Sequence, residues 1–178
     1  MRNVYLDYSA TTPVKEEVLK EMIPFFTEKF GNPSSLYDKG LEAKASVTHA
    51  REQVAALINA NPREVFFTAG GTEADNWALF GACDNLKEKG NHIITTKVEH
   101  HAILHSCQFL EKHGFDVTYV GIDKDGMVNL QELEDAITDK TILISVMMVN
   151  NEIGTVQPIK EIAKIAKAHK ILFHTDAV

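Results

Sequence analysis

The stretch TILISVMMV (141–149) has an apolar side chain at nearly every position. A strand with one face toward solvent alternates apolar and polar residues. A continuous apolar run of this length indicates instead a strand that is buried on both faces. Such strands are typical of parallel sheets that are covered by helices on each side. This one stretch therefore predicts an α/β fold with a mostly parallel sheet.

Four more β-type runs lie along the chain, and helical patterns separate them. The runs are EVFFT (64–68), HIITT (92–96), DVTYV (116–120) and KILFH (170–174). Helical patterns begin after Thr12-Pro13, span 41–58, follow the glycines at 70–71, and begin again at Asn129 and Pro158. Alternating strands and helices predict right-handed crossovers and helices on both faces of the sheet.

The composition excludes several classes of function. The 178 residues include 18 Lys and Arg against 25 Asp and Glu, a net charge of −7, and no basic cluster. This argues against a nucleic-acid or anionic-membrane partner. No apolar run approaches the roughly 20 residues of a membrane span, and the first residues lack the apolar core of a signal peptide. Two cysteines form no disulfide framework, so we predict a cytoplasmic protein.

A glycine turn between a strand and a helix, in VFFTAGGTEADNWAL (65–79), is the first candidate site. The start of a helix presents unpaired N–H groups and a positive dipole end. With the Gly71 backbone and the Thr72 hydroxyl, these groups can bind a phosphate. The alternative is a simple glycine turn in which Thr72 caps the helix.

Three histidines follow the 92–96 strand. His101 and His105 lie one helical turn apart, but a metal site would need a third ligand from elsewhere, and we predict none. A solvated cluster at a helix start is one alternative. Another is that the His100 ring, at the carboxyl edge of the sheet, stacks on a flat cofactor and moves protons.

Two polar residues at other strand ends complete the candidate site. Asn151 follows the 141–149 run, where it is either a turn residue or an amide donor to a ring oxygen. Asp176 follows the last strand, where it either caps a helix or binds a protonated ring nitrogen. Because the carboxyl ends of parallel strands share one edge, we expect both residues beside Thr72 and His100.

Six segments, in order, resemble the NifS-like cysteine desulfurases, a family of fold-type-I, class-V aminotransferase-like enzymes that depend on pyridoxal phosphate. The segments are YLDYSATTP, FGNPSSLY, VFFTAGGTEADN, HIITTKVEHHAIL, VNNEIGTVQPI and FHTDAV. The resemblance runs from Leu6 to Val178. It implies that residues 1–15 are an N-terminal arm and that residues 16–178 are the first part of the large cofactor-binding domain.

The resemblance implies a role for each matching residue. Gly71 and Thr72 correspond to the phosphate-binding turn, and His100 to the histidine that stacks on the ring and transfers protons. Asn151 corresponds to the asparagine near the phenolic oxygen, and Asp176 to the aspartate bonded to the pyridine nitrogen. A protonated ring is an electron sink, so His100 and Asp176 are the expected catalytic residues.

The implied reaction takes sulfur from L-cysteine, leaving L-alanine and an enzyme persulfide. The implied partner is a sulfur acceptor, either an iron–sulfur scaffold or a relay for RNA thiolation, and the implied assembly is a homodimer. Selenocysteine lyases and class-V aminotransferases resemble the same segments and are the alternatives.

Two essential groups of the family have no counterpart in the sequence. The lysine that bonds to the cofactor and the nucleophilic cysteine would both follow Val178. Cys83 and Cys107 each lie near leucines on a helix and are expected to be packed thiols. We therefore expect an N-terminal fragment that has no desulfurase activity by itself.

Overall fold

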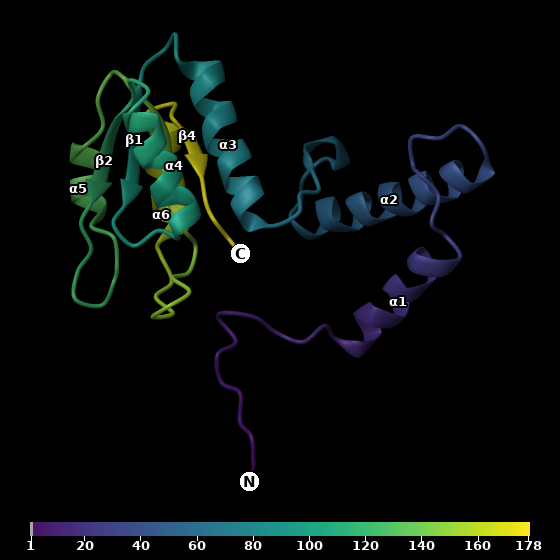
Figure 1. Cartoon of the computed structure of the whole chain (residues 1–178). Helices are drawn as coiled ribbons and strands as arrows, with labels where there is room; N and C mark the ends of the chain where they lie inside the picture. Colours follow the sequence, from purple (N-terminus) through teal and green to yellow (C-terminus); the bar gives the residue numbers. More distant parts are fainter. Residues whose placement is uncertain (1) are drawn as a thin grey trace. The chain divides into compact units, whose positions relative to one another are not determined.

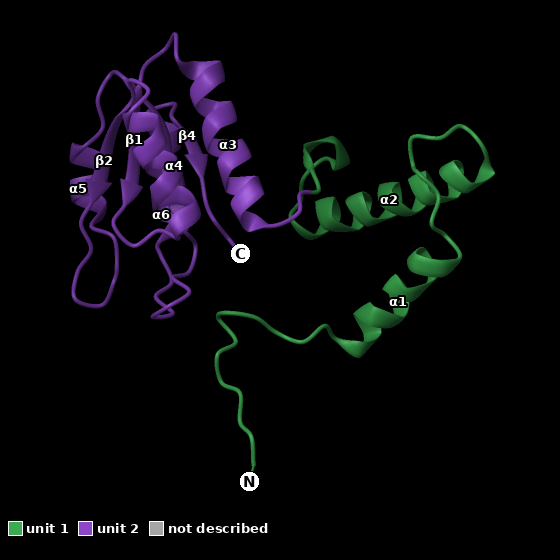
Figure 2. Cartoon of the chain, viewed as in Figure 1, with its two compact units in different colours: residues 1–67 green, residues 68–178 purple. Residues whose placement is uncertain are grey.

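The computed structural model describes residues 2–178, which fall into two compact units, residues 2–67 and residues 68–178 (Figure 2). Each unit is described by itself. The predicted boundary between an arm and the large domain, after residue 15, does not coincide with the boundary between these units. It stays a prediction. All the candidate site residues belong to the second unit.

The first unit is helical. It contains α1 (Glu16–Thr27), α2 (Asp38–Leu57) and the 3-10 helix η1 (Pro62–Glu64). The first helix begins at Glu16, three residues after the predicted proline start, and Pro24 lies inside it. At η1 the Asn61 side chain accepts the N–H of Arg63 at 2.9 Å, and the Glu64 carboxylate accepts the N–H of Asn61 at 2.7 Å. These two bonds satisfy N–H groups that the helix start leaves unpaired.

The predicted strand over residues 64–68 is wrong. Its first residue, Glu64, ends η1, and residues 65–68 form no strand. Val65 is buried and its carbonyl accepts a hydrogen bond from Arg51, but the side chains of Phe66 and Phe67 are exposed. A strand forms only where a neighbouring strand bonds its backbone, so an apolar, β-prone run is not sufficient.

The second unit is built on a sheet of four strands that are all parallel. They are β1 (His92–Thr96), β2 (Asp116–Val120), β3 (Thr141–Ser145) and β4 (Leu172–His174), in the order β2-β1-β3-β4. Every residue of β1 and β3 is buried, as the continuous apolar runs predict. The predicted α/β class with a mostly parallel sheet is confirmed.

Helices cover both faces of this sheet (Figure 1). On one face α3 (Gly71–Leu86) and α4 (His101–Glu111) pack on Ile93 and Leu143. On the other face α5 (Leu130–Asp135) and α6 (Ile159–Ala168) pack on Ile94 and Ile144. Adjacent strand residues therefore point into different cores, which is why these strands contain apolar residues without alternation.

The carboxyl ends of the strands meet at one edge. β3 ends at Ser145, four residues before the predicted end, and β4 begins at Leu172 rather than at residue 170. Backbone bonds continue beyond β3, however: Met148 N donates to the carbonyl of Asp176 at 2.7 Å. Among residues 2–178, none of the helices combines the length and the apolar character that a bilayer crossing requires.

Candidate active site

The start of α3 lies at the carboxyl edge of the sheet, against the end of the described chain. A Cβ atom built on Gly71 would lie 2.6 Å from Cγ2 of Val178, so glycine permits this close approach. Val178 is two residues after Asp176, and its N–H donates to Asp176 Oδ1 at 3.0 Å. The helix start with its unpaired N–H groups is thus held near the buried carboxylate of Asp176.

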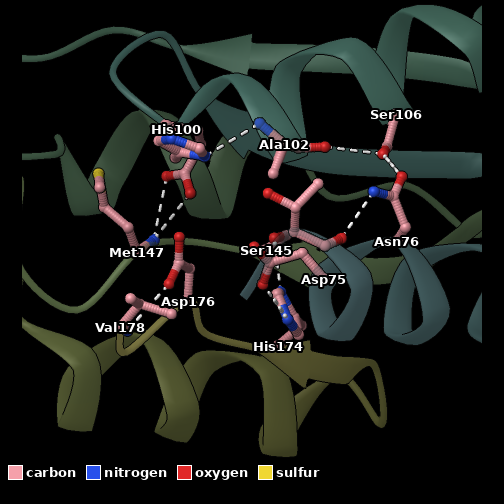
Figure 3. A network of polar contacts seen from close by, with 12 residues as sticks. Asp75, Asn76, His100, Ala102, Ser106, Ser145, Met147, His174, Asp176 and Val178 are labelled. Atoms are coloured by element: carbon pink, nitrogen blue, oxygen red, sulfur yellow. Dashed lines mark hydrogen bonds and ion pairs between the residues drawn. The ribbon is translucent and has the colours of Figure 1, made fainter. Parts of the chain in front are cut away.

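Thr72 and His100 line one hollow of about 680 Å³. It lies between α3, which contributes Thr72, and α4, which lines it as far as Phe109 and has His100 as its N-cap residue. His100 Nδ1 accepts the N–H of Ala102 at 3.1 Å, and this bond fixes the orientation of the imidazole ring. Asn76 and Ser106, also in the lining, share a hydrogen bond that ties α3 to α4 (Figure 3).

Asp176 follows β4 and is only 9% exposed. The N–H of Val178 and the N–H of Met148 hold its side chain and its carbonyl, respectively. Its charge acts on two other buried carboxyl groups, those of Asp75 and Glu99. Figure 3 shows Asp176 between Met147 and Val178, on the same side of the network as His100.

Asn151 is the one predicted site residue that the structure does not join to the others. Its side chain is exposed, and Nδ2 donates to Oε1 of Glu152 at 3.2 Å. The preceding residue, Asn150, is buried and structural. Its Nδ2 donates to the carbonyl of Val98 at 2.9 Å, and its Oδ1 accepts the N–H of Glu152 and of Ile153.

Asp75 and Glu99 are buried carboxyl groups that the sequence reasoning missed. Burial is the main cause that raises the pKa of Asp75 to about 6. The charge of Asp176 also raises this pKa, whereas His100 lowers it. Burial also raises the pKa of Glu99 to about 7, against hydrogen bonds from Thr96 and Met147. Shifts of this size collect at functional sites. Burial therefore favours the protonated forms of Asp75 and Glu99, and their ionised forms repel one another and Asp176.

A sequence signal for Asp75 did exist. Asp75, Leu79 and Cys83 follow one another at four-residue spacing in α3, and all three are buried. A carboxylate on the apolar stripe of a helix is rare unless it is paired or functional. No comparable spacing marks Glu99, which lies in the turn between β1 and α4.

The histidine pair of α4 does not form a metal site with other described residues. The His101 and His105 rings stack with centroids 5.3 Å apart. Within residues 2–178 no group of three or more His, Cys, Asp or Glu side chains is placed to bind one metal ion.

The two cysteines are packed thiols, as expected. Cys83 is 1% exposed and Cys107 is fully buried, both in the core under α3 and α4. Burial raises the pKa of Cys83 to about 11 and that of Cys107 to about 12. Because the thiolate is the nucleophile, neither residue suits nucleophilic catalysis.

The geometry fits a small anionic ring that also carries a cationic nitrogen. The start of α3 can bind an anionic end, an imidazole lies beside the hollow, and the Asp176 carboxylate lies in a cluster of buried carboxyl groups. A protonated ring nitrogen at Asp176 would neutralise part of that charge. Pyridoxal phosphate has these three features, so the residues present fit it.

A parallel α/β sheet with polar groups gathered at its carboxyl edge is typical of α/β proteins that bind a ligand at that edge. Comparison with known proteins identifies the family. The chain belongs to the aminotransferase class-V family, whose model matches residues 4–178. This family is generally dependent on pyridoxal phosphate.

Relatives within the family are cysteine desulfurases. The chain is 61% identical over 177 residues to "Cysteine desulfurase IscS" of Clostridium botulinum, covering 99% of this chain and 45% of that protein. It is 56% identical to the protein of the same name from Methanosarcina thermophila, covering 98% of this chain and 43% of that protein. The chain thus spans about half the length of the curated relatives it matches.

Solved structures agree with this assignment. A structure described as "NIFS-LIKE PROTEIN" superimposes with a TM-score of 0.97 at 42% identity, over 99% of this chain and 49% of that one. Another, "SspA in complex with cysteine", superimposes with a TM-score of 0.93 at 43% identity, over 97% of this chain and 50% of that one.

Proposed function

We propose that this chain carries the cofactor-holding residues of a cysteine desulfurase. The full-length enzyme would take L-cysteine, transfer its sulfur to a cysteine thiolate as a persulfide, and release L-alanine. The observation that carries the proposal is the burial of Asp176 beside the start of α3, at the edge where His100 and Thr72 share a hollow. The names of the relatives supply the substrate.

Each site residue has a separate task in this proposal. The N–H groups at Gly71 and Thr72, with the Thr72 hydroxyl, donate to the cofactor phosphate. The Asp176 carboxylate accepts the N–H of the ring nitrogen and keeps that nitrogen protonated. Pyridoxal phosphate supplies an electron sink when bound. The His100 imidazole stacks on the ring face and moves the proton at the substrate Cα.

Asn151 is the residue whose proposed task requires a change in its contacts. To donate to the phenolic oxygen of the cofactor, its Nδ2 must use its second N–H or exchange the Glu152 carboxylate for that oxygen. Asn151 is exposed and lies in the turn after β3, so the exchange moves no buried group.

The proposal extends to the whole enzyme. The residue matches suggest an arm over residues 1–15 ahead of the large domain. Two buried free thiols favour a reducing compartment, which supports a cytoplasmic location. We propose a homodimer that passes sulfur to an iron–sulfur scaffold or to a thiolation relay. Sedimentation of the full-length protein as a monomer would contradict the dimer.

The test is to add pyridoxal phosphate to the cofactor-free, full-length protein and then supply L-cysteine. We expect visible absorption from the bound cofactor, followed by sulfide (in the presence of a thiol reductant) and alanine in equal amounts. Failure to bind the cofactor would refute the proposed site. Selenocysteine turnover without cysteine turnover would favour a selenocysteine lyase, and amino transfer to a 2-oxo acid would favour an aminotransferase. Residues 1–178 alone should release no sulfide.

A further inference from the structure

Glu99 is a buried carboxylate that joins two strand ends. It lies in the turn after β1 and is 5% exposed, which is unusual for glutamate. Its Oε1 accepts the Thr96 hydroxyl at 2.6 Å, within its own turn. The N–H of Met147, in the segment after β3, lies 3.0 Å from both Oε1 and Oε2. Glu99 thus bridges the ends of two neighbouring strands.

Each end of this bridge leads directly to a proposed cofactor-binding residue. On the β1 side the next residue is His100, the N-cap of α4. On the β3 side the next residue is Met148, whose N–H donates to the Asp176 carbonyl at 2.7 Å. Glu99 is therefore the neighbour of His100 in the sequence. Through Met147 and Met148 it is one backbone hydrogen bond away from the segment that contains Asp176.

We propose that Glu99 is a positioning residue that sets the separation between the His100 ring and the Asp176 carboxylate. The inference rests on the proposed function, in which these two groups hold one cofactor ring by its face and by its nitrogen. A ring held at two points needs both points fixed, because a small displacement at either one weakens binding and misorients the ring.

The charged groups around Glu99 show why a structural bridge alone does not explain it. Asp75 in α3 and Asp176 after β4 both face it and, together with burial, raise its pKa, while the bonds from Thr96 and Met147 lower it. A neutral bridge joins the same two segments nearby, where Asn150 donates to the carbonyl of Val98. A further buried carboxylate beside two others is costly for stability, so it suits a residue kept for the site.

Replacing Glu99 by glutamine weakens the bridge while keeping the size of the side chain. Met147 N lies 3.0 Å from both carboxylate oxygens, so either orientation of a glutamine amide places an NH₂ group against the Met147 N–H. The remaining amide oxygen can still accept the Met147 N–H, but the NH₂ group opposes this N–H, so the strand ends should move apart. Both His100 and Asp176 should shift with them.

Gln157 offers a matched control. It is also buried, and it also bridges backbone segments: Oε1 accepts the N–H of Val128 at 2.9 Å and Nε2 donates to the carbonyl of Gly126 at 2.7 Å. Gln157→Glu is the reverse exchange of one atom, and it places a second acceptor against the Gly126 carbonyl. The Gln157 backbone N–H also donates to the Met148 carbonyl at 2.9 Å, and the exchange leaves this bond in place. The variant should therefore destabilise the fold without moving His100 or Asp176.

The experiment compares full-length wild type, Glu99→Gln and Gln157→Glu. The readouts are the melting temperature of the cofactor-free proteins, the apparent affinity for pyridoxal phosphate, and the visible circular dichroism of the bound cofactor. We expect Glu99→Gln to bind roughly tenfold more weakly with an altered dichroism band, by analogy with the loss of one buried hydrogen bond. Gln157→Glu should melt earlier yet keep the wild-type affinity and band.

Two results would overturn the inference. One is a Glu99→Gln protein with the wild-type affinity and band. The other is an equal loss of affinity in Gln157→Glu, which would make the Glu99 effect a general loss of stability. If wild type itself binds no cofactor, the proposed function fails and takes this inference with it. Should Glu99→Gln not fold, Glu99→Asp replaces it, since its shorter side chain cannot span the same gap, and the same results decide.

Discussion

Nε2 of His174 lies 3.6 Å from Oδ1 of Asp75, and both side chains are largely buried on the α3 face of the sheet. The other ring nitrogen of His174, Nδ1, lies 2.9 Å from Oγ of Ser145 (Figure 3). Burial lowers the pKa of His174, although the charge of Asp176 opposes this. The ring is therefore neutral near pH 7, and it compensates little of the charge on Asp75.

We expect the stability of the cofactor-free protein to fall as Asp75 ionises. Its pKa is 3.8 when unfolded and about 6 when folded, so the folded state binds the proton more tightly. The contribution is fully present below pH 3.8 and is lost as the pH rises through about 6. Asp75→Asn removes this titration. Relative to wild type, the variant should therefore gain roughly a few degrees in melting temperature between pH 4.5 and 7.5.

The exposed Asp139, at the opposite end of the sheet, provides the control for this titration. Melting curves of Asp139→Asn should run parallel to those of wild type over the same pH range. A difference between Asp75→Asn and wild type that stays constant with pH would show that Asp75 does not titrate in this window.

Asp176→Asn should lower sulfide release by the full-length enzyme about 100-fold or more, by analogy with the loss of other electrostatic contacts in active sites. The amide oxygen can still accept the Val178 N–H, so the local fold should persist. An amide cannot keep the ring nitrogen protonated. Asp123→Asn is the matched control, because Asp123 is an exposed turn carboxylate on the same edge. Comparable activity of Asp176→Asn and wild type would refute the assigned role.

Thr72→Val should weaken binding of pyridoxal phosphate roughly tenfold, because one hydroxyl donor to a charged phosphate is lost while the side chain keeps its shape. Equilibrium titration of the cofactor-free protein measures this change. Thr138→Val is the control: its hydroxyl accepts the N–H of Lys140 at 3.2 Å, at the amino end of β3. Equal affinities for all three proteins would exclude Thr72 from the phosphate site.

Cys83 and Cys107 should remain unmodified when the native protein is treated with iodoacetamide at pH 7.5, and both should react after unfolding. Burial blocks access, and it also raises the pKa of both thiols far above this pH. Peptide mapping by mass spectrometry distinguishes the two sites. Rapid labelling of either residue in the folded protein would contradict the packing.

The sequence predicts β1 and β2 to the residue, because each is a compact β-prone run between helices with clear starts. The same reasoning fails at residues 64–68. A run of Val and Phe shows that a segment can be a strand, but whether another strand lies beside it depends on the rest of the fold. β3 ends earlier than predicted for a similar reason, because the Met147 N–H donates to the side chain of Glu99.

For the candidate site, motif position predicts Thr72, His100 and Asp176 at one edge, since strand ends and helix starts are local features. It does not predict that Asn151 binds Glu152, because side-chain partners in an exposed turn are chosen by small energy differences. Nor does it find Glu99, whose acceptor role depends on a backbone N–H 48 residues away.

By itself, the order of polar and apolar residues determined the parallel α/β sheet, its two helical layers and the edge at which the candidate site residues lie. Local periodicity is enough for this, because a strand buried on both faces requires a helix on each side. Only the tertiary structure decided that Asp75, Glu99 and Asp176 share one buried patch. Their charges and protonation depend on burial and on contacts between distant segments, which no local pattern contains.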